Sequence, residues 1–315
     1  MSKAKLTASR MRAARACQRL HHLQYALGYR SVAEPDALKF GTLVHKGLEA
    51  WWLANDGQRL VAAQSAMLDC EADPFHVAKA QVMLTAYDLR WSAEPYDILA
   101  VEAAFQCELR NPATGRPSQT FDLAGKIDAI VRDRRDGRVL IVEHKTSSEN
   151  ITPGSEYWRR LRMDGQVSVY FEGARSLGFD VAGCLYDVLS KPGQKPLQVN
   201  SKRKTPETPE EYRLRVAEAV AKEPNEYFQR SEVSRLESEM EEAMFDIWQT
   251  AQQIRESELA NRAPRNPDSC VKWNRTCPYF DVCTGAASLD DTTLFKRTEI
   301  HPELSGEQTP KEGAA

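Results

Sequence analysis

The chain has 315 residues, of which 42% are hydrophobic and 28% are charged. This length allows one large domain or two ordinary ones, and it can bury a core without disulfide bonds. The 42 basic and 45 acidic side chains leave a net charge of −3, which excludes a uniformly basic coat for nucleic acid. The sequence has neither a secretory signal nor an apolar run of about 18 residues, so we expect a cytoplasmic protein without a membrane span.

Helical patterns fill most of the first hundred residues. We predict helices over residues 8–28, 39–55, 57–70 and 75–93. The first of these helices carries Cys17 and the second carries His45. We therefore expect residues 1–96 to form an N-terminal helical region.

Strand patterns dominate the following part of the chain. We predict strands over residues 97–109, 120–133, 138–147 and 182–190, with one helix over residues 155–177. The Asp136-Gly137 dipeptide between two apolar runs indicates a hairpin. The order β-β-β-α-β predicts a mixed α/β fold, in which a central mixed sheet over residues 97–230 is flanked by helices.

The C-terminal part is polar and rich in cysteine. We predict a long helix over residues 232–261, within a segment 231–288 that packs back on the N-terminus. We expect the tail, residues 289–315, to be disordered. The chain has seven cysteines, and disulfides are improbable in a cytoplasmic protein.

The predicted hairpin brings charged residues together at the end of an apolar strand. A two-residue loop would pair Arg135 with Arg138, which places Asp128 opposite Lys145 and diagonal to Glu143. Because the strand is apolar on both faces, we expect it to be buried, and unpaired charges at its end would be energetically unfavourable. The charged residues there therefore require an explanation. One reason is an ion-pair cluster at the sheet edge. The other is a metal site, because two carboxylates suit Mg²⁺ and an adjacent ammonium can orient the attacking water during phosphodiester hydrolysis.

The string GKIDAIVRD…VLIVEHKTSS resembles the core of the PD-(D/E)XK nuclease superfamily, in particular its RecB-like exonuclease branch. That branch has a Gly-x-x-x-His helix, a Gly-x-x-Asp strand, a Glu-x-Lys strand and a Gln-x-x-x-Tyr helix. The matching residues here are Gly41, His45, Gly125, Asp128, Glu143, Lys145, Gln166 and Tyr170. The resemblance implies a restriction-endonuclease-like core and extends over residues 10–285.

The resemblance also implies a role for each matching residue. His45, Asp128 and Glu143 would ligate Mg²⁺ or Mn²⁺, and Lys145 would assist the water and the transition state. His144 faces the other way along its strand, so only its backbone carbonyl could ligate the metal. Gln166 and Tyr170 would position the substrate. Glu102 lies where related nucleases sometimes carry another acid.

Four cysteines form a second candidate site. The spacing of Cys270, Cys277 and Cys283 lacks the close pairs of zinc modules, so by itself it is a weak indication of metal. RecB-like nucleases of the AddB and CRISPR-associated kinds hold an iron–sulfur cluster with one early and three late cysteines. Cys17 matches the early position, which implies a [4Fe–4S] cluster; the late spacing departs from those relatives and leaves the cluster type open. Zinc and no metal are the alternatives.

Together these residues predict a metal-dependent DNA exonuclease of recombination, repair or phage DNA processing. It would act on DNA ends, on a single strand at the site, with a helicase or a single-strand annealing or binding protein as a possible partner. The alternative is a non-catalytic nucleic-acid-binding or scaffolding module of a helicase–nuclease assembly. The intact set of Asp128, Glu143 and Lys145 argues against that alternative.

Overall fold

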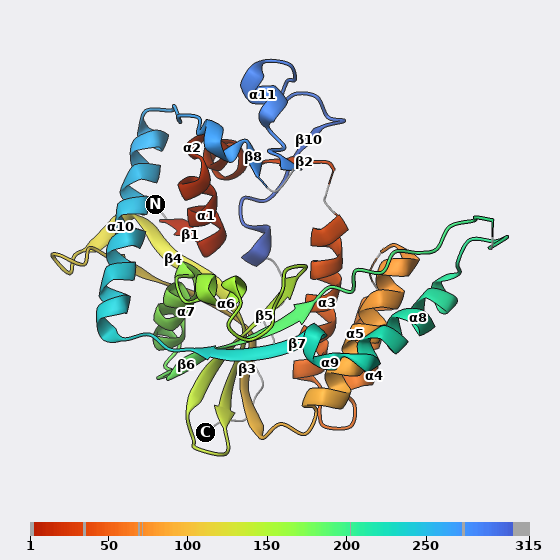
Figure 1. The fold of residues 1–315 in the computed structure, drawn as a ribbon. Helices are drawn as coiled ribbons and strands as arrows, with labels where there is room; N and C mark the ends of the chain where they lie inside the picture. Colours follow the sequence, from red (N-terminus) through yellow and green to blue (C-terminus); the bar gives the residue numbers. More distant parts are fainter. Residues whose placement is uncertain are drawn as a thin grey trace.

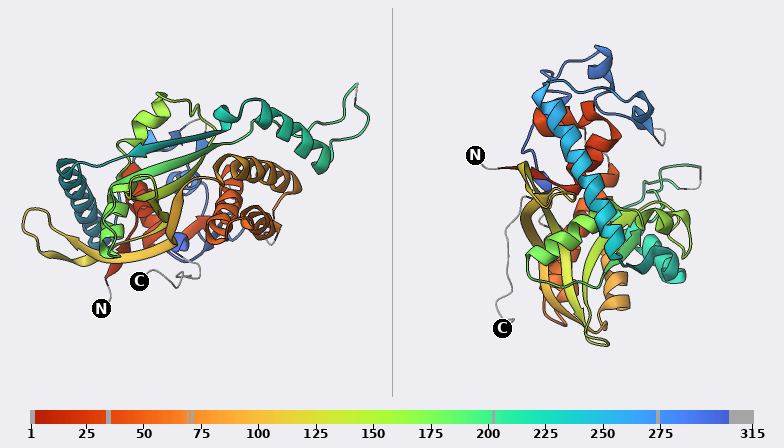
Figure 2. Two further views of the ribbon diagram at one scale, coloured as in Figure 1. Left: turned by 90° about the horizontal axis from the view of Figure 1, so that it is seen from below. Right: turned by 90° about the vertical axis from the view of Figure 1, so that its left-hand side faces the viewer.

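The computed structural model describes residues 3–33, 36–68, 70, 72–201, 203–272 and 275–304. A six-stranded mixed sheet lies at its centre, with helices on both faces (Figures 1 and 2), which confirms the predicted fold class. The strands of this sheet are β1 (Ala4–Leu6), β3 (Tyr96–Arg110), β4 (Pro117–Asp133), β5 (Val139–Ser147), β6 (Gly183–Ser190) and β7 (Phe228–Val233). None of the helices described here is long and apolar enough to cross a membrane.

The long strand β4 organises the sheet. β3 pairs with it in antiparallel fashion along one edge, while β1 and β5 share the other edge. β1 pairs in parallel with residues 121–123, and β5 pairs in antiparallel fashion with residues 129–132. Residues 124–128 therefore face no strand of the described chain on this edge. This gap is where the candidate site opens.

The turn between β4 and β5 differs from the predicted one. The Asp133 N–H donates to the Arg138 carbonyl at 2.9 Å, so the loop contains the four residues 134–137. Arg132 pairs with Val139, which shows that the predicted pairing of Arg135 with Arg138 was wrong by two positions. Because a shift of two keeps the alternation of side chains, the predicted faces of β5 hold.

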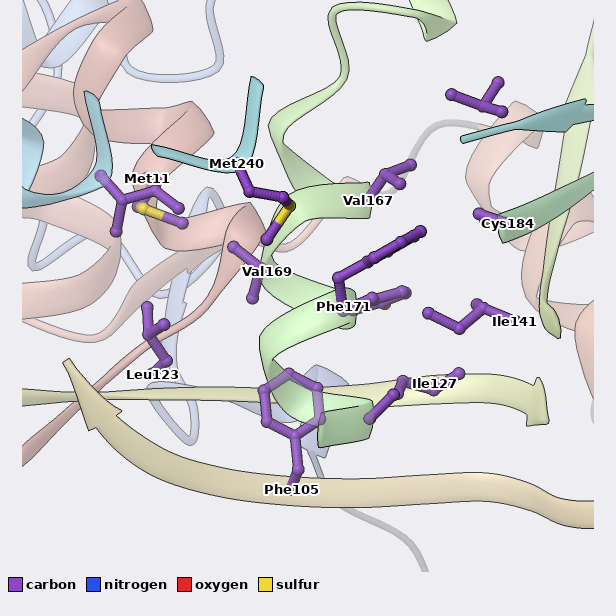
Figure 3. Close-up of a cluster of buried hydrophobic side chains, with 14 of the residues drawn as sticks. Met11, Phe105, Leu123, Ile127, Ile141, Val167, Val169, Phe171, Cys184 and Met240 are labelled. Atoms are coloured by element: carbon purple, nitrogen blue, oxygen red, sulfur yellow. The ribbon is translucent and has the colours of Figure 1, made fainter. Parts of the chain in front are cut away.

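One face of the sheet is covered by α1 (Ala8–Ala16), α7 (Gly165–Ser176) and α10 (Glu237–Leu259). Figure 3 shows Val167, Val169 and Phe171 of α7 among the apolar side chains of this core. Phe105 packs against Gly173 so closely that a Cβ at Gly173 would lie 2.4 Å from its ring. The absence of a side chain there lets α7 lie directly on the sheet.

The other face carries a second core. It is covered by α3 (Asp36–Leu53), α4 (Arg59–Leu68), α5 (Pro74–Trp91) and α8 (Pro209–Lys222). Trp51 of α3 and Tyr87 of α5 are fully buried in it, beside Leu140 and Val142 of β5. β5 is thus buried on both faces, as its apolar sequence predicted. The short α9 (Pro224–Tyr227) leads from α8 into β7.

Two predicted helices are interrupted. The first helix stops at Ala16 because Cys17 is extended, with φ −165°; the chain resumes as α2 (Gln18–His21) and a π-helix, η1 (His22–Ala26). The helix predicted over residues 155–177 is divided into α6 (Glu156–Leu161) and α7. Asp164 causes the second break, because its side chain caps α7 by accepting from the Gln166 N–H.

The C-terminal segment packs on the N-terminal helices, at the top of Figure 1. Its elements are η2 (Pro267–Ser269), β8 (Val271–Lys272), β9 (Arg275–Thr276), α11 (Phe280–Thr284), β10 (Phe295–Arg297) and η3 (Pro302–Leu304). β10 pairs with β2 (Tyr29–Ser31), and Phe295 is 4% exposed and stacks on Tyr279. Residues 289–304, which we expected to belong to a disordered tail, include β10 and η3 and contact segments that are distant in sequence. Residues 305–315 lie outside the described chain.

Candidate active site

The gap between β1 and β5 opens into a cavity of about 830 Å³. The start of α1, one side of α3, strands β4 and β5, and the first turns of α7 form its walls. All seven residues predicted for the catalytic site line this cavity: His45, Asp128, Glu143, His144, Lys145, Gln166 and Tyr170. The structure thus brings together residues that are separated by up to 125 positions in sequence.

Asp128 lies at the point where the β4–β5 ladder ends. The last paired residues are Ala129 and Val142, and the register places Asp128 opposite Glu143. The His144 N–H donates to Asp128 Oδ2 at 2.7 Å. Burial raises the pKa of the Asp128 carboxyl, even though the charge of His144 and this hydrogen bond favour its ionised form. The carboxylate is held in place and desolvated.

Glu143 belongs to a connected polar group with Lys145, Gln166 and Tyr170. Lys145 Nζ lies 2.6 Å from Glu143 Oε1 and 2.8 Å from Gln166 Oε1. The Gln166 amide nitrogen lies 2.8 Å from both Glu143 Oε1 and the Tyr170 hydroxyl. The other oxygen of Glu143, Oε2, is buried without a hydrogen-bond partner in the described chain.

Burial and the charge of the partner have opposite effects on the pKa of Glu143 and on the pKa of Lys145. Burial raises the pKa of Glu143 to about 7, although Lys145 favours its ionised form. Burial alone would lower the pKa of Lys145, but the adjacent Glu143 carboxylate outweighs it and raises that pKa. Lys145 is therefore a cation at neutral pH, while Glu143 is poised to lose its proton there.

His45 approaches the carboxylates from α3. Its Nδ1 lies 3.9 Å from Asp128 Oδ2. Burial, together with the neighbouring His144, lowers the pKa of His45 to about 4, so its imidazole is neutral and can act as a metal ligand. Gly41, one turn earlier, faces β5: a Cβ there would lie 3.2 Å from the Thr146 hydroxyl. This close approach brings α3 against the end of β5.

The His144 side chain faces the opposite core, as predicted. Its Nδ1 lies 3.2 Å from Asp187 Oδ2, which also accepts hydrogen bonds from Tyr87 and Arg230. Asp187 is fully buried, and the charges of Arg230 and His144 lower its pKa despite burial. This buried ionic group holds β5 in place on the face of the sheet opposite to Glu143 and Lys145.

Glu102 completes a row of carboxylates across three strands. The β3–β4 register places it opposite Asp128, which in turn lies opposite Glu143. Its φ of +50° is unusual for a residue with a side chain, and its carboxylate forms an ion pair with Lys126. Arg12 of α1 also lines the cavity, with Nη2 3.4 Å from Gln166 Oε1. Arg12 was not among the predicted site residues, because α1 is far from the strands in sequence.

The donor set at the gap fits a divalent cation. Within the residues that the structure describes, no three His, Cys, Asp or Glu groups already surround one point closely enough to hold an ion. Asp128 and Glu143 are nevertheless adjacent carboxylates, the second of them buried with an oxygen that lacks a partner in the described chain, and a neutral imidazole lies beside them. Such oxygen-rich donors suit Mg²⁺ or Mn²⁺.

A second cavity, of about 260 Å³, is lined by Cys17, Cys270, Cys277 and Cys283. All four thiols are free of disulfides. The extended backbone at Cys17 places it beside the C-terminal segment, where the Asn266 N–H donates to its Sγ at 3.3 Å. Burial raises the pKa of Cys277 and of Cys283, and the other cysteines raise both further. The structure thus gathers the early cysteine and the three late ones around one space.

Comparison with known proteins agrees with this geometry. The sequence model of the PD-(D/E)XK nuclease superfamily matches residues 5–284. The chain belongs to this superfamily. No curated protein matches the chain in a sequence search.

Solved structures are similar to this chain at low sequence identity. A candidate exonuclease from Eubacterium rectale is similar over 96% of this chain and 94% of its own, with 10% identity and a TM-score of 0.50. A phage-related exonuclease from Haemophilus somnus 129PT is similar over 69% of this chain and 94% of its own, with 13% identity and a TM-score of 0.35. At 10% identity, the likeness to the Eubacterium rectale protein shows a shared fold and no more.

Proposed function

We propose that this PD-(D/E)XK nuclease is a Mg²⁺- or Mn²⁺-dependent deoxyribonuclease of the RecB-like exonuclease branch. The convergence of Asp128, Glu143 and Lys145 in one cavity carries the proposal. A half-buried lysine between a carboxylate and an amide has no evident structural purpose at the open end of a strand. In a nuclease it is placed to act on a phosphate.

Each residue has a role in phosphodiester hydrolysis. Asp128, Glu143 and His45 would hold the divalent cation, with the His144 carbonyl as a further oxygen donor. When bound, the cation would lower the pKa of a coordinated water and neutralise phosphate charge. Lys145 orients the attacking water and donates to a non-bridging phosphoryl oxygen as charge develops on it. Water forms the new bond to phosphorus and gives up one proton to solvent, the bond to the leaving oxygen breaks, and that oxygen takes up one proton from solvent.

Gln166 and Tyr170 act as positioning residues. Gln166 contacts both Glu143 and Lys145, so its amide fixes the pair against α7. Tyr170 in turn contacts Gln166, and burial raises its pKa well above the ordinary value, so its hydroxyl stays protonated. Together they would keep the Lys145 ammonium directed at the phosphate.

The walls of the cavity support a requirement for a DNA end. Thr7 at the start of α1 donates to Glu303 of η3, and both residues line the cavity. This contact joins the start of α1 to η3 of the C-terminal segment, at the wall of the cavity that also holds Asp128 and Glu143. A strand entering between α1 and α3 would therefore be threaded from its end.

The four cysteines would hold an iron–sulfur cluster. Their thiols share one cavity at the junction of α1, α2 and the C-terminal segment, and thiolates are the preferred ligands of such clusters. A cluster there would join segments more than 250 residues apart. We assign the protein to DNA recombination, repair or phage DNA processing, with a helicase or a single-strand annealing protein as partner.

The test is release of acid-soluble nucleotides from linear DNA. The protein should release nucleotides from single- or double-stranded linear DNA with Mg²⁺ or Mn²⁺, and EDTA should abolish the release. A covalently closed circle serves as the control for end dependence. No release with either metal and either strand type would refute catalysis and favour a non-catalytic binding or scaffolding module.

A further inference from the structure

Three basic side chains from separate segments gather beside the active-site cavity. They are Lys79 of α5, Lys191 directly after β6, and Arg275 of β9; we call them the basic cluster. Lys191 and Arg275 line the cavity itself. The ammonium groups of Lys79 and Lys191 lie 5.7 and 5.8 Å from the ring centroid of Phe40, next to the cavity-lining Gly41.

The members of the basic cluster repel one another. Burial lowers the pKa of Lys79 and of Lys191, and the charges of Arg275 and Lys79 lower that of Lys191 further. In the described part of the chain, neither Lys79 nor Arg275 forms an ion pair with a carboxylate. Like charges held together in this way produce a local positive potential that complements an anion.

Arg275 occupies a special position in the fold. The short hairpin of β8 and β9 lies between Cys270 and Cys277, and the Cys277 N–H donates to the Cys270 carbonyl at 2.7 Å. Arg275 lines both the cysteine cavity and the active-site cavity. The hairpin that the cysteines anchor therefore presents a guanidinium to the catalytic cavity.

We infer that Lys79, Lys191 and Arg275 form a phosphate-binding subsite for the nucleic-acid backbone, beside the catalytic carboxylates. The inference rests on the proposed function and specifies how that site takes its substrate. A guanidinium matches the geometry of phosphate oxygens, and backbone contacts of this kind carry no sequence preference. The subsite holds a phosphate next to the one that is cleaved, so it contributes to substrate affinity and leaves the chemical step to Lys145.

The experiment is fluorescence anisotropy with fluorescein-labelled oligonucleotides of mixed sequence, single- and double-stranded. The full chain is used, with Ca²⁺ in place of Mg²⁺, over a range of salt concentrations. The variants are Arg275→Ala, Arg275→Lys and the double variant Lys79→Met with Lys191→Met. Lys272→Ala is the matched control, because Lys272 pairs with Arg275 in the same hairpin but does not line the active-site cavity.

Arg275→Ala should weaken binding about tenfold. It should also reduce the slope of log K against log salt by about 0.7 for single strands, the value for one lost phosphate contact. Arg275→Lys should recover part of the affinity, the double lysine variant should lose affinity, and Lys272→Ala should bind like wild type. In cleavage assays, Arg275→Ala should raise KM and leave kcat unchanged.

The subsite would be overturned by one result. In that result, the Arg275→Ala variant and the double lysine variant bind DNA with the same affinity and the same salt slope as Lys272→Ala. The result is separable from the proposed function, because binding is measured without cleavage. Binding that depends on the basic cluster, without any cleavage of DNA by wild type, would refute the nuclease and leave the subsite standing. Thermal unfolding of each variant identifies a folding defect. If Arg275→Ala is defective in folding, the DNA affinity of Arg275→Lys is compared with that of Lys272→Ala, and equal affinities would overturn the subsite.

Discussion

The His144 N–H donates to the Asp128 carboxylate at 2.7 Å, at the position where the β4–β5 ladder ends. The Asp128 side chain thus accepts the hydrogen bond that a main-chain carbonyl of β4 would accept in a continuous ladder. Beyond this position β4 and β5 are no longer paired. The gap that opens holds the other predicted catalytic residues. Because the hydrogen bond fixes one Asp128 oxygen, the carboxylate is oriented without a metal ion, which favours precise positioning of a bound cation.

Replacing Asp128 by Asn should separate stability from function. Burial raises the pKa of Asp128, so an amide, which still accepts from His144, should stabilise the metal-free protein by about 1 kcal/mol at pH 8. The same variant should lose cleavage, and it should lose the rise in Tm that we expect Mg²⁺ to produce in wild type. Asp122→Asn on the same strand, outside the cavity, is the control and should keep that rise. An equal Mg²⁺ response in Asp128→Asn would remove Asp128 from the metal site.

His21 should make stability depend on pH. It is 1% exposed, its Nε2 accepts from Arg10, and burial together with the Arg10 charge lowers its pKa to about 3. Between the unfolded value of about 6.5 and about 3, the unfolded chain binds a proton that the folded chain does not. The free energy of unfolding should therefore fall by about 1.4 kcal/mol per pH unit below pH 6. His21→Gln should lose less stability between pH 7 and pH 5 in denaturant unfolding; equal losses would contradict this.

β4 and β5, which carry Asp128, Glu143 and Lys145, could be predicted because the sequence pattern that indicates each strand lies within the strand itself. Apolar runs around Asp128 and Glu143 locate both strands, and the Asp136-Gly137 turn joins them. The register was wrong because the Asp133 side chain accepts from the Arg135 N–H and supports a wider loop. Since the predicted register was shifted by two residues, Glu143 and Lys145 remain on the predicted face of β5. The prediction of the candidate site therefore did not depend on the exact register.

Other parts of the fold depend on distant contacts that no local pattern reports. β1 has three residues and is a strand because it pairs with residues 121–123, and β2 likewise depends on β10. The contributions of Arg12 and Arg275 to the cavity arise in the same way. The break before α7 did have a local indication, because an Asp164-Gly165 dipeptide inside a helical pattern is typical of a helix start.

Cys17→Ser should abolish binding of the proposed cluster in the cysteine cavity. Anaerobically purified wild type should be brown and contain iron and acid-labile sulfide, because Cys17, Cys270, Cys277 and Cys283 all line the cavity in which we propose the cluster. The variant should lose both and unfold at lower temperature, since the cluster ties the N-terminal helices to the C-terminal segment. Cys70→Ser, at a cysteine outside that cavity, should keep iron and colour. Stoichiometric zinc without iron or sulfide would leave a zinc site instead.

The protein should need a DNA end. Thr7 and Glu303 form a hydrogen bond at the wall of the cavity, and we expect this wall to admit a strand that is threaded from its end. Linear DNA should be degraded from its termini, while a covalently closed circle of equal length stays intact in a gel assay. Cleavage of both at the same rate would make the enzyme an endonuclease.

The most direct test of catalysis at this site is Lys145→Ala, measured by single-turnover cleavage of end-labelled linear DNA with Mg²⁺. The expected loss of rate is at least about 100-fold, the effect of removing one preorganised donor to the transition state. DNA binding and Tm should change little, because Glu143, with a pKa of about 7, can take up a proton when its partner is removed. Lys39→Ala on the exposed side of α3 should cleave like wild type. Cleavage by Lys145→Ala at the wild-type rate would contradict the account.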